Sequence, residues 1–224
     1  MNTEADVYAR AAVHRALGEP HLLMIVEALG LSDRSPSDLQ TVTGLSSNLL
    51  AFHLDVLEQA GVIDRNQSAG DGRRRYLRLR VPIWSSAPQF VRPVGGPVLF
   101  VCTHNSARSQ LAAGLWRRWT GRQAMSAGTT PAERVHPLAV EVAGTHGLDL
   151  AGERPRAYAD IDIAPDLVVS VCDRAHEAGL PWQVEQLHWS VPDPAAGARP
   201  AFERAYVDID KRVQQLAVAT GAAA

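Results

Sequence analysis

A proline-rich stretch near the middle of the chain divides the sequence into two halves of different pattern. Residues 81–97 read VPIWSSAPQFVRPVGGP, which holds four prolines and an adjacent pair of glycines. Proline fixes φ and lacks a backbone N–H, so this density interrupts both helices and interior strands. A chain of 224 residues also suits two domains of about 100 residues each. We therefore predict two domains, residues 1–80 and 97–224, joined by a linker over 81–96.

The half before the linker has a helical pattern followed by an extended one. The expected helices are 6–17, 20–30, a short one within 35–44 that Gly44 ends, and one that begins at Ser46 or Ser47 and ends at Gly61. Two β-like runs follow at 62–66 and 74–80, and Asp71-Gly72 between them is a hairpin turn signal. Helices joined by tight turns and followed by a hairpin predict a mainly α, winged helix-turn-helix domain.

Basic residues gather in the predicted hairpin, although the formal net charge of the chain is only −2. They are Arg73, Arg74, Arg75, Arg78 and Arg80. In a winged helix-turn-helix the second helix enters the DNA major groove and the wing contacts phosphates. On this interpretation the residues facing DNA are Ser46, Ser47, Asn48 and Phe52 from the helix, and Arg73, Arg74 and Arg75 from the wing. The alternative is a solvated hairpin without a nucleic-acid partner.

This first half resembles the ArsR family of bacterial repressors over about residues 6–80. The resemblance rests on Leu45-Ser46-Ser47, His53–Leu57 and Ala60–Ile63, followed by the basic wing. It implies a homodimer that binds a palindromic double-stranded DNA operator. Metalloid-sensing members carry a cysteine cluster near these helices, and residues 29–40 hold no cysteine, so direct arsenite sensing through that cluster is excluded.

The histidines of the first half are expected to have ordinary structural or surface roles. His53 is expected to be a structural residue of its helix rather than a ligand, and the same is expected of His14 and His21. No metal site is predicted anywhere in the chain.

The half after the linker alternates short apolar runs with helical patterns. The expected buried strands are 97–101 and 166–171, and the expected helices are about 109–120, 138–146 and 202–220. Wholly apolar strands are typical of parallel sheets that are covered on both faces. We therefore predict an α/β domain with a central parallel sheet.

A loop of specific composition joins the first of these strands to the helix that follows. It reads Cys102-Thr103-His104-Asn105-Ser106-Ala107-Arg108-Ser109. A loop that bends back at a helix N-terminus points its backbone N–H groups inward, and such a nest binds a tetrahedral oxyanion. Arg108 adds a planar clamp, and the positive field favours the thiolate form of Cys102, which is then positioned for in-line attack. A buried cysteine and an unrelated surface arginine are the alternative interpretation.

Two loop residues have further expected roles. Ser109 is expected to hydrogen-bond the thiolate or to cap the helix. Asn105 tolerates the positive φ that a tight loop needs, and its amide can brace the loop. The predicted oxyanion-binding residues are Thr103, His104, Asn105, Ser106, Ala107 and Arg108, with arsenate or phosphate as the ligand.

This second half resembles the low-molecular-weight phosphatase superfamily, which includes one class of arsenate reductases. Besides the loop, the resemblance rests on Ser126–Thr129, His136-Pro137, Leu167–Cys172 and His188–Pro194. It implies that Asp193, on a mobile loop, is the general acid. Expelling an oxygen leaving group requires a proton donor near it, and a carboxylic acid can supply one. The alternative for Asp193 is a turn-forming residue between two prolines.

Departures from the family pattern bear on the reaction. His104 stands where glycine is common, a substitution that the mycothiol-linked reductases share. Asp193-Pro194-Ala195 differs from the Asp-Pro-Tyr of tyrosine phosphatases. Cys172 matches the second cysteine of the thioredoxin-linked reductases, but Gly179 stands where a third is expected. We therefore expect an external reductant, either a low-molecular-weight thiol such as mycothiol or a thioredoxin- or mycoredoxin-type protein. Cys172 is either a regulatory disulfide partner of Cys102 or an inert buried thiol.

Three hypotheses follow from these two halves. The first is a fused transcriptional regulator and arsenate reductase. The second is a tyrosine phosphatase-like phosphomonoesterase tethered to a DNA-binding domain. The third is a repressor that senses an oxyanion without turnover, which the nucleophile Cys102 and the acid Asp193 disfavour. With two cysteines, no apolar run of about 18 residues and no signal pattern, we expect a cytoplasmic protein without a tightly bound cofactor and without a membrane partner.

Overall fold

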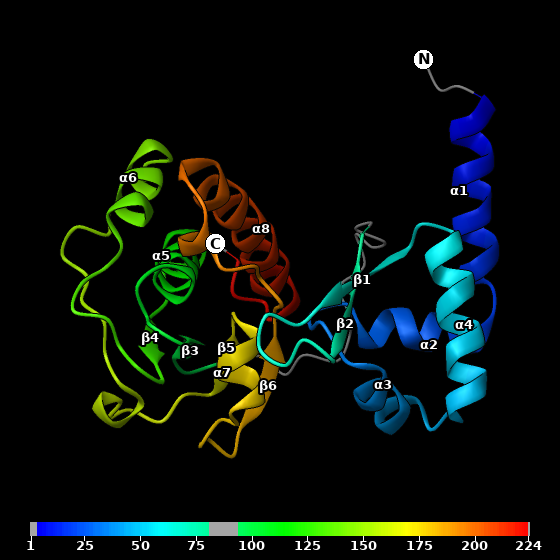
Figure 1. The fold of residues 1–224 in the computed structure, drawn as a ribbon, viewed down its shortest axis with the longest axis horizontal. Coiled ribbons are helices and arrows are strands. Elements are labelled where there is room, and N and C mark those ends of the chain that lie inside the picture. Colours follow the sequence, from blue (N-terminus) through cyan, green and yellow to red (C-terminus); the bar gives the residue numbers. More distant parts are fainter. Residues whose placement is uncertain (1–3, 81–93, 224) are drawn as a thin grey trace. The chain divides into compact units, whose positions relative to one another are not determined.

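The computed structural model describes residues 4–80 and 94–223, which form two compact units (Figure 1). Of the described residues, 4–68 and 72–80 belong to the first unit, and 69–71 and 94–223 belong to the second. Most of the predicted linker, residues 81–93, lies outside the described residues.

Within residues 4–80, the first unit holds four helices and one antiparallel hairpin. The elements are α1 (Glu4–Leu17), α2 (Pro20–Ala28), α3 (Pro36–Thr43), α4 (Ser47–Gln59), β1 (Ile63–Gln67) and β2 (Arg75–Leu79). Helix α3 begins at a capping box of Ser35 and Asp38, because each side chain accepts from the backbone N–H of the other. It ends at Gly44, whose φ of 71° is the left-handed conformation that glycine adopts without strain.

A single apolar core holds the first unit together. Leu50, Leu54 and Leu57 from α4 pack with Ile25 of α2 and Leu77 of β2, and all of them are buried. The opposite side of α4 remains exposed, including Asn48 and Phe52. The sequence pattern predicted these elements to within a few residues at each end.

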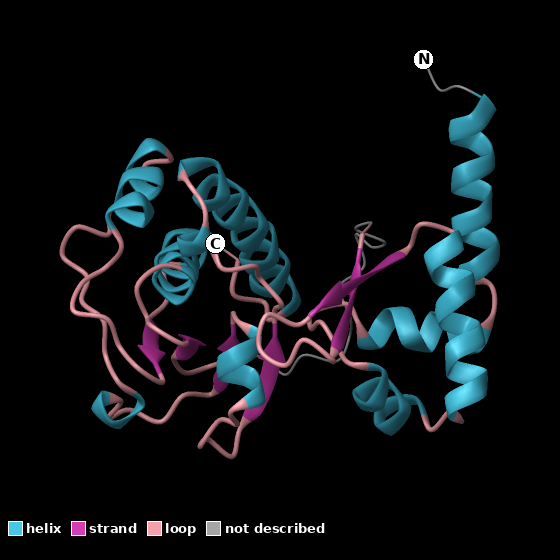
Figure 2. Ribbon diagram, in the orientation of Figure 1, coloured by secondary structure: helices cyan, strands magenta, loops and turns pink. Residues whose placement is uncertain are grey.

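The second unit is an α/β layer structure (Figure 2). Its strands are β3 (Val98–Cys102), β4 (Ala124–Gly128), β5 (Leu167–Ser170) and β6 (Glu185–His188), all parallel in the order β4-β3-β5-β6. Its helices are α5 (Arg108–Thr120), α6 (Pro137–Thr145), α7 (Asp173–Glu177) and α8 (Arg199–Ala219), with short 3-10 turns η1 (Tyr158–Asp160) and η2 (Pro194–Ala196). The predicted central parallel sheet is confirmed.

Both faces of the central strand β3 are buried, as its apolar sequence predicted. On one face Phe100 contacts the rings of Trp116 and Trp189, at centroid distances of 6.3 and 5.9 Å. On the other face Leu99 and Val101 belong to a separate apolar cluster. The carboxyl ends of β3 and β5 meet at one edge of the sheet, where β3 ends at Cys102 and Cys172 follows β5. This edge is where parallel α/β sheets place their ligand sites.

Three elements of the second unit were not expected from the sequence pattern. Strand β4 reads AMSAG and strand β6 reads EQLH, so neither shows the β-branched, wholly apolar composition of a buried strand. Helix α7 is only five residues long. The two strands form because β3 and β5 supply neighbours with which β4 and β6 pair. Within 4–80 and 94–223, no helix combines the length and apolar character that a membrane span requires.

Candidate functional site

The loop from Cys102 to Ala107 is held by hydrogen bonds on its outer side. The carbonyl oxygens of Cys102, Thr103, His104 and Ser106 accept from backbone N–H groups between Thr129 and His136, at 2.8–3.3 Å. In a trans peptide the N–H points opposite to the C=O. The N–H groups of the following residues, including Asn105 and Ala107, therefore point to the inside of the loop. The N–H of Asn105 donates to Cys102 Sγ at 3.2 Å, which identifies the sulfur as the base of the loop.

Asn105 is the brace of this loop. Its φ of 47° is the one positive value among the described residues other than glycine, and its side chain is fully buried. Its Oδ1 accepts from Gln110 Nε2 at 3.1 Å and from the N–H of Arg156 at 2.8 Å. A Cβ at Gly128 would lie 2.9 Å from the N atom of Asn105, so only glycine fits at this end of β4.

Ser109 lies beside the candidate nucleophile. Its Oγ is 3.0 Å from Cys102 Sγ and accepts from Asn105 Nδ2 at 2.8 Å. Because the amide supplies a proton to this oxygen, the hydroxyl proton of Ser109 is available to the sulfur. The geometry therefore favours a hydrogen bond from Ser109 to a Cys102 thiolate.

Arg108 and Asp193 come together although they lie 85 positions apart in the chain. Arg108 is 5% exposed, and it begins helix α5. Its Nη1 donates to the carbonyl of Val191 at 2.9 Å, and its Nη2 lies 3.1 Å from Asp193 Oδ2. The side chain of Asp193 is 40% exposed and also caps η2 by accepting from the N–H of Ala195. The clamp residue and the candidate acid are therefore adjacent in the folded chain.

Cys172 lies close to this loop at the neighbouring strand end. Its Sγ is 3.4 Å from Thr103 Oγ1 and accepts from the N–H of Ala175 at 3.4 Å. Burial raises the pKa of the Cys172 thiol, the neighbouring sulfur of Cys102 raises it further, and the guanidinium of Arg108 acts in the opposite direction. Both cysteines are free and buried. Cys172 is thus a protonated thiol near neutral pH, held within electrostatic reach of Cys102.

Gly179 marks the position where a third cysteine was expected. It has a φ of 83° and follows the C-cap of helix α7. A residue with a side chain is strained in this conformation. The turn therefore explains the glycine on structural grounds.

Tyr158 belongs to the site although the sequence pattern did not single it out. Burial and then the nearby sulfurs of Cys172 and Cys102 raise the pKa of its phenol far above the ordinary value. Its hydroxyl is buried and has no hydrogen-bond partner among the residues that the structure describes. The phenol is therefore a protonated, unused donor near both thiols. Its position, between the resemblance motifs at Ser126–Thr129 and Leu167–Cys172, offered no signal in the sequence.

A second group that the sequence pattern missed is a buried polar network beneath the acid loop. His188 Nε2 lies 3.1 Å from Asp173 Oδ1, and His188 Nδ1 lies 2.9 Å from Ser170 Oγ. All three side chains are at most 3% exposed, and the ring of His176 stacks on that of His188 at 4.0 Å. Burial raises the pKa of Asp173, but hydrogen bonds, led by that from His188, outweigh it and hold the pKa below its usual value. The network ties β5, α7 and β6 together beside Cys172.

The remaining predicted loop residues and the predicted DNA-facing residues have the following positions. His104 is exposed, with Nδ1 3.0 Å from the carbonyl of Thr130, so its ring does not line the inside of the loop.

Ser46 is at the N-cap position of α4, and Ser47 Oγ accepts from Gln40 Nε2. Asn48 and Phe52 lie on the exposed side of α4, and Arg73, Arg74 and Arg75 are exposed where the hairpin turns.

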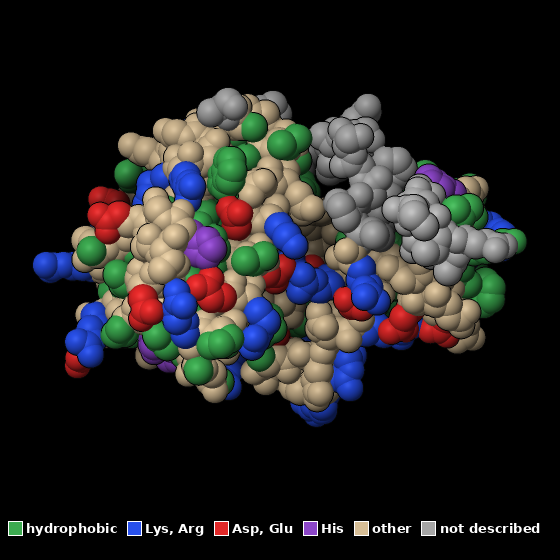
Figure 3. Space-filling model, turned by 90° about the horizontal axis from the view of Figure 1, so that it is seen from above, with side chains coloured by type: hydrophobic (Ala, Val, Ile, Leu, Met, Phe, Trp, Pro, Cys, Tyr) green, Lys and Arg blue, Asp and Glu red, His purple; other side chains and the backbone are tan. Residues whose placement is uncertain are grey.

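On the face shown in Figure 3, basic and acidic side chains are interspersed, in keeping with the formal net charge of −2. Recognition of an anion by this chain therefore depends on local geometry rather than on bulk charge.

Comparison with known proteins identifies the second unit. Residues 97–223 match the family model of the low molecular weight phosphotyrosine protein phosphatases. A protein named arsenate reductase from Brevibacillus brevis is 32% identical over 125 residues, which span 54% of this chain and 92% of that protein. A protein named glutaredoxin arsenate reductase from Synechocystis sp. is 27% identical over 123 residues, which span 53% of this chain and 94% of that protein.

A solved structure agrees with these relatives. The structure described as an arsenate reductase in the phosphate binding state is 26% identical and has a TM-score of 0.50, covering 55% of this chain and 97% of its own. The parallel sheet, the loop from Cys102 to Ala107 and the match to the family model all lie within residues 97–223. The relatives from Brevibacillus brevis and Synechocystis sp. are named as arsenate reductases. The chain therefore belongs, through residues 97–223, to the low molecular weight phosphotyrosine protein phosphatase family.

Proposed function

We propose that the second unit reduces arsenate to arsenite with Cys102 as nucleophile, and that the first unit binds operator DNA as a winged helix-turn-helix of the ArsR type. The observation that carries the enzymatic proposal is the position of Cys102 Sγ at the base of a loop whose N–H groups point inward. The names of the relatives direct the choice of oxyanion toward arsenate. Thr103, His104, Asn105, Ser106 and Ala107 supply the backbone of the loop, and Arg108 the guanidinium.

The first chemical step is a condensation. The Cys102 thiolate attacks the arsenic atom of bound arsenate, an S–As bond forms, and one As–O bond breaks. Asp193 protonates the departing oxygen, which leaves as water. Arg108 and the N–H groups of the loop stabilise the negative charge on the remaining oxygens. Ser109 stabilises the attacking thiolate through its hydroxyl.

The second step is the reduction itself. An external thiol attacks the sulfur of Cys102, and the electron pair of the S–As bond passes to arsenic. As(V) becomes As(III), arsenite leaves, and the two sulfurs are oxidised to a mixed disulfide. A second thiol or a redox protein then restores Cys102. Cys172 is protonated at neutral pH and Gly179 replaces a third cysteine, which supports an external reductant over an internal cascade.

Two assays on one preparation distinguish an arsenate reductase from a phosphatase. The purified chain is assayed for thiol-dependent arsenite release and, in parallel, for hydrolysis of an aryl phosphate. We expect arsenite release that requires added thiol and is abolished in Cys102→Ser. Aryl phosphate hydrolysis without arsenite release would assign a phosphatase instead. Failure of both, with an oxyanion-dependent DNA affinity, would assign a sensor without turnover.

The proposal for the first unit rests on the exposed face of α4 and on the hairpin. Asn48 and Phe52 are exposed near the N-terminal end of α4, where a recognition helix contacts bases. Three exposed arginines follow at the turn between β1 and β2, where a wing contacts phosphates. We propose a homodimer on a palindromic site, as the ArsR resemblance implies.

A further inference from the structure

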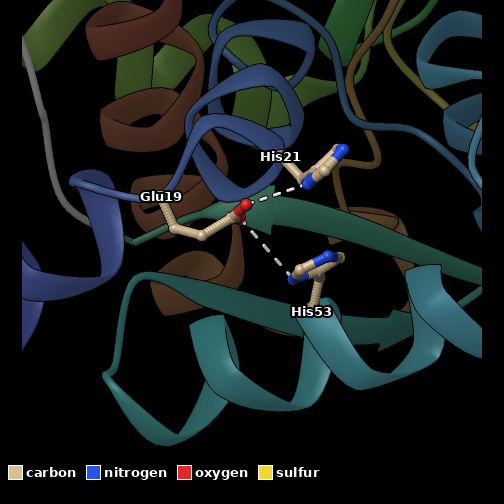
Figure 4. A group of neighbouring side chains, drawn as sticks. All are labelled: Glu19, His21 and His53. Atoms are coloured by element: carbon tan, nitrogen blue, oxygen red, sulfur yellow. Dashed lines mark hydrogen bonds and ion pairs between the residues drawn. The ribbon is translucent and has the colours of Figure 1, made fainter.

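A cluster of ligand-type side chains lies in the first unit, far in sequence from the cysteine loop (Figure 4). It consists of Glu19, His21 and His53. Each offers one donor atom, and the three donor atoms lie within 4.8 Å of one another. Figure 4 shows the carboxylate of Glu19 beside both imidazole rings, with His21 at the start of α2 and His53 on α4. The cluster forms only on folding, because His21 and His53 lie on different helices that are distant in the chain.

The geometry of the three side chains is close to that of a metal site. Glu19 Oε1 is 2.8 Å from His21 Nδ1, and Glu19 Oε2 is 3.8 Å from His53 Nδ1. The two rings stack at a centroid distance of 5.4 Å and an angle of 27°. Tetrahedral zinc with bonds of about 2.0–2.2 Å needs donors about 3.4 Å apart. The side chains of Glu19 (38%) and His21 (44%) are partly exposed, which leaves them room to rotate toward this spacing.

An independent observation points to a ligand. The side chain of His53 is 8% exposed, yet neither of its ring nitrogens has a hydrogen-bond partner within the described part of the chain. Buried polar groups in native proteins are almost always satisfied, and an exception requires an explanation such as an ion. A metal bound to Nδ1 of His53 would satisfy one of these nitrogens from the side that Glu19 faces.

We propose that Glu19, His21 and His53 form a binding site for a borderline divalent transition-metal ion, of which Zn²⁺ is the representative. Two imidazoles and one carboxylate suit such ions, whereas Ca²⁺ and Mg²⁺ prefer sites made wholly of oxygen donors. Three protein ligands leave the fourth tetrahedral position for solvent, on the side where Glu19 and His21 are exposed. The inference does not depend on DNA binding or on arsenate reduction. It replaces the expectation that these two histidines are ordinary residues.

Glu19 also has a structural role that the test must separate from metal binding. Its Oε2 accepts from the N–H of Leu22 at 2.8 Å and so caps helix α2. Glu19→Gln keeps an oxygen acceptor for this cap but removes the charged ligand. His21→Gln changes a half-exposed side chain and leaves the cap intact. Both variants are therefore expected to fold, which circular dichroism checks.

The experiment uses the full chain, stripped of metal with a chelator. Zn²⁺ binding is measured by competition with a chromophoric chelator, and Co²⁺ is added for its visible absorption. We expect one equivalent of Zn²⁺, with affinity at least tenfold weaker in Glu19→Gln and in His21→Gln. The matched control is His14→Gln, since His14 is exposed on α1 outside the cluster. Mg²⁺ and Ca²⁺ are expected not to compete.

Cys102 and Cys172 are the competing thiolate ligands, so a Cys102→Ser, Cys172→Ser double variant is included. The site predicts full Zn²⁺ affinity in this variant and a Co²⁺ spectrum without thiolate charge-transfer bands. The ¹⁵N shifts of the His53 ring should move on Zn²⁺ addition, which tests the buried ligand without replacing it. Absence of stoichiometric binding, loss of binding in the cysteine variant, or unchanged affinity in Glu19→Gln and His21→Gln would overturn the site.

Discussion

At the scale of single residues, the chemistry of the site depends on which side chain donates to which. Cys102 Sγ accepts a hydrogen bond from the N–H of Asn105 at 3.2 Å and lies 3.0 Å from the hydroxyl oxygen of Ser109. The corresponding partners of Cys172 Sγ, the N–H of Ala175 and the hydroxyl of Thr103, are each more distant at 3.4 Å, and burial raises the pKa of the Cys172 thiol. The two thiols are therefore distinct in reactivity, with Cys102 suited to attack and Cys172 suited to remain protonated.

Asp193→Asn tests the general acid. The amide can still lie beside Arg108 but has no proton to transfer, so we expect kcat for arsenite release to fall about 10²–10⁴-fold. The measurement is the steady-state rate as a function of pH. In the pH–rate profile of the variant, the limb that reports ionisation of the general acid should be absent. Asp162→Asn, at an exposed aspartate, serves as the control. A rate within about twofold of wild type would limit Asp193 to its structural contacts with Arg108 and η2.

Tyr158→Phe tests the unused phenol beside the thiols. Its removal deletes a buried hydroxyl without a partner in the described structure, so thermal stability should not decrease. We expect kcat/KM for arsenate to fall about tenfold, as removal of one hydrogen bond of about 1.4 kcal/mol in the transition state requires. Tyr8→Phe, at an exposed tyrosine, is the control. An unchanged kcat/KM would show that the phenol only fills space.

At the scale of elements, the site is assembled where strands end and helices begin. Strand β3 ends at Cys102, β5 ends shortly before Cys172, and α5 begins at Arg108. The buried network of Ser170, His188 and Asp173 links β5, β6 and α7 directly behind this edge. It therefore fixes the strand β6 from which the acid loop departs.

Asp173 makes this network sensitive to acid. Its pKa is lower in the folded state than in the unfolded chain, so it contributes stability above its unfolded pKa of about 3.9, and this stability is lost as pH falls through the folded pKa. We expect Asp173→Asn to lower the free energy of unfolding by about 1–3 kcal/mol at pH 7. The difference from wild type, followed by urea denaturation, should shrink below about pH 4. A difference that does not vary with pH would contradict the assignment.

The hairpin β1–β2 carries the prediction for the first unit. Replacing Arg73, Arg74 and Arg75 by Gln should weaken DNA binding and reduce the slope of log K against log salt by about 0.9 for each phosphate that is no longer neutralised. The probe is a duplex selected by the protein from a random-sequence pool. Three exposed arginines of the second unit, Arg118, Arg134 and Arg204, provide a variant of equal charge change. An unaltered slope in the hairpin variant would count against a wing.

At the scale of the whole molecule, two units with separate cores carry two separate proposals. The core of the first unit is built on α2 and α4, whereas that of the second surrounds β3. Separate cores allow each unit to keep its fold when a side chain of the other changes.

Cys102→Ser measures this independence. We expect arsenite release to be abolished while affinity for the selected duplex stays within about twofold, because the substitution removes a buried nucleophile of the second unit and changes no residue of the first unit. DNA binding by fluorescence anisotropy and arsenite by chromatography are measured on one preparation. Loss of DNA binding in a folded Cys102→Ser protein would show that the two units do not act independently.

The sequence by itself determined the features that depend on local pattern. The apolar run before Cys102 predicted a buried parallel strand, Gly44 and Gly61 predicted helix ends, and the spacing from Cys102 to Arg108 predicted the loop. The positive φ of Asn105 was also expected from the residue type. Such features follow from neighbours in the chain, whose steric and hydrogen-bonding preferences act over a few residues.

Only the tertiary structure decided which distant residues meet. The pairing of Arg108 with Asp193, the approach of Tyr158 to the two thiols and the cluster of Glu19, His21 and His53 all join positions with no shared pattern. Strands β4 and β6 likewise form because neighbouring strands offer backbone partners, not because their own residues favour extension. Long-range contacts are fixed by the packing of whole elements, and their side chains leave no periodic trace in the sequence.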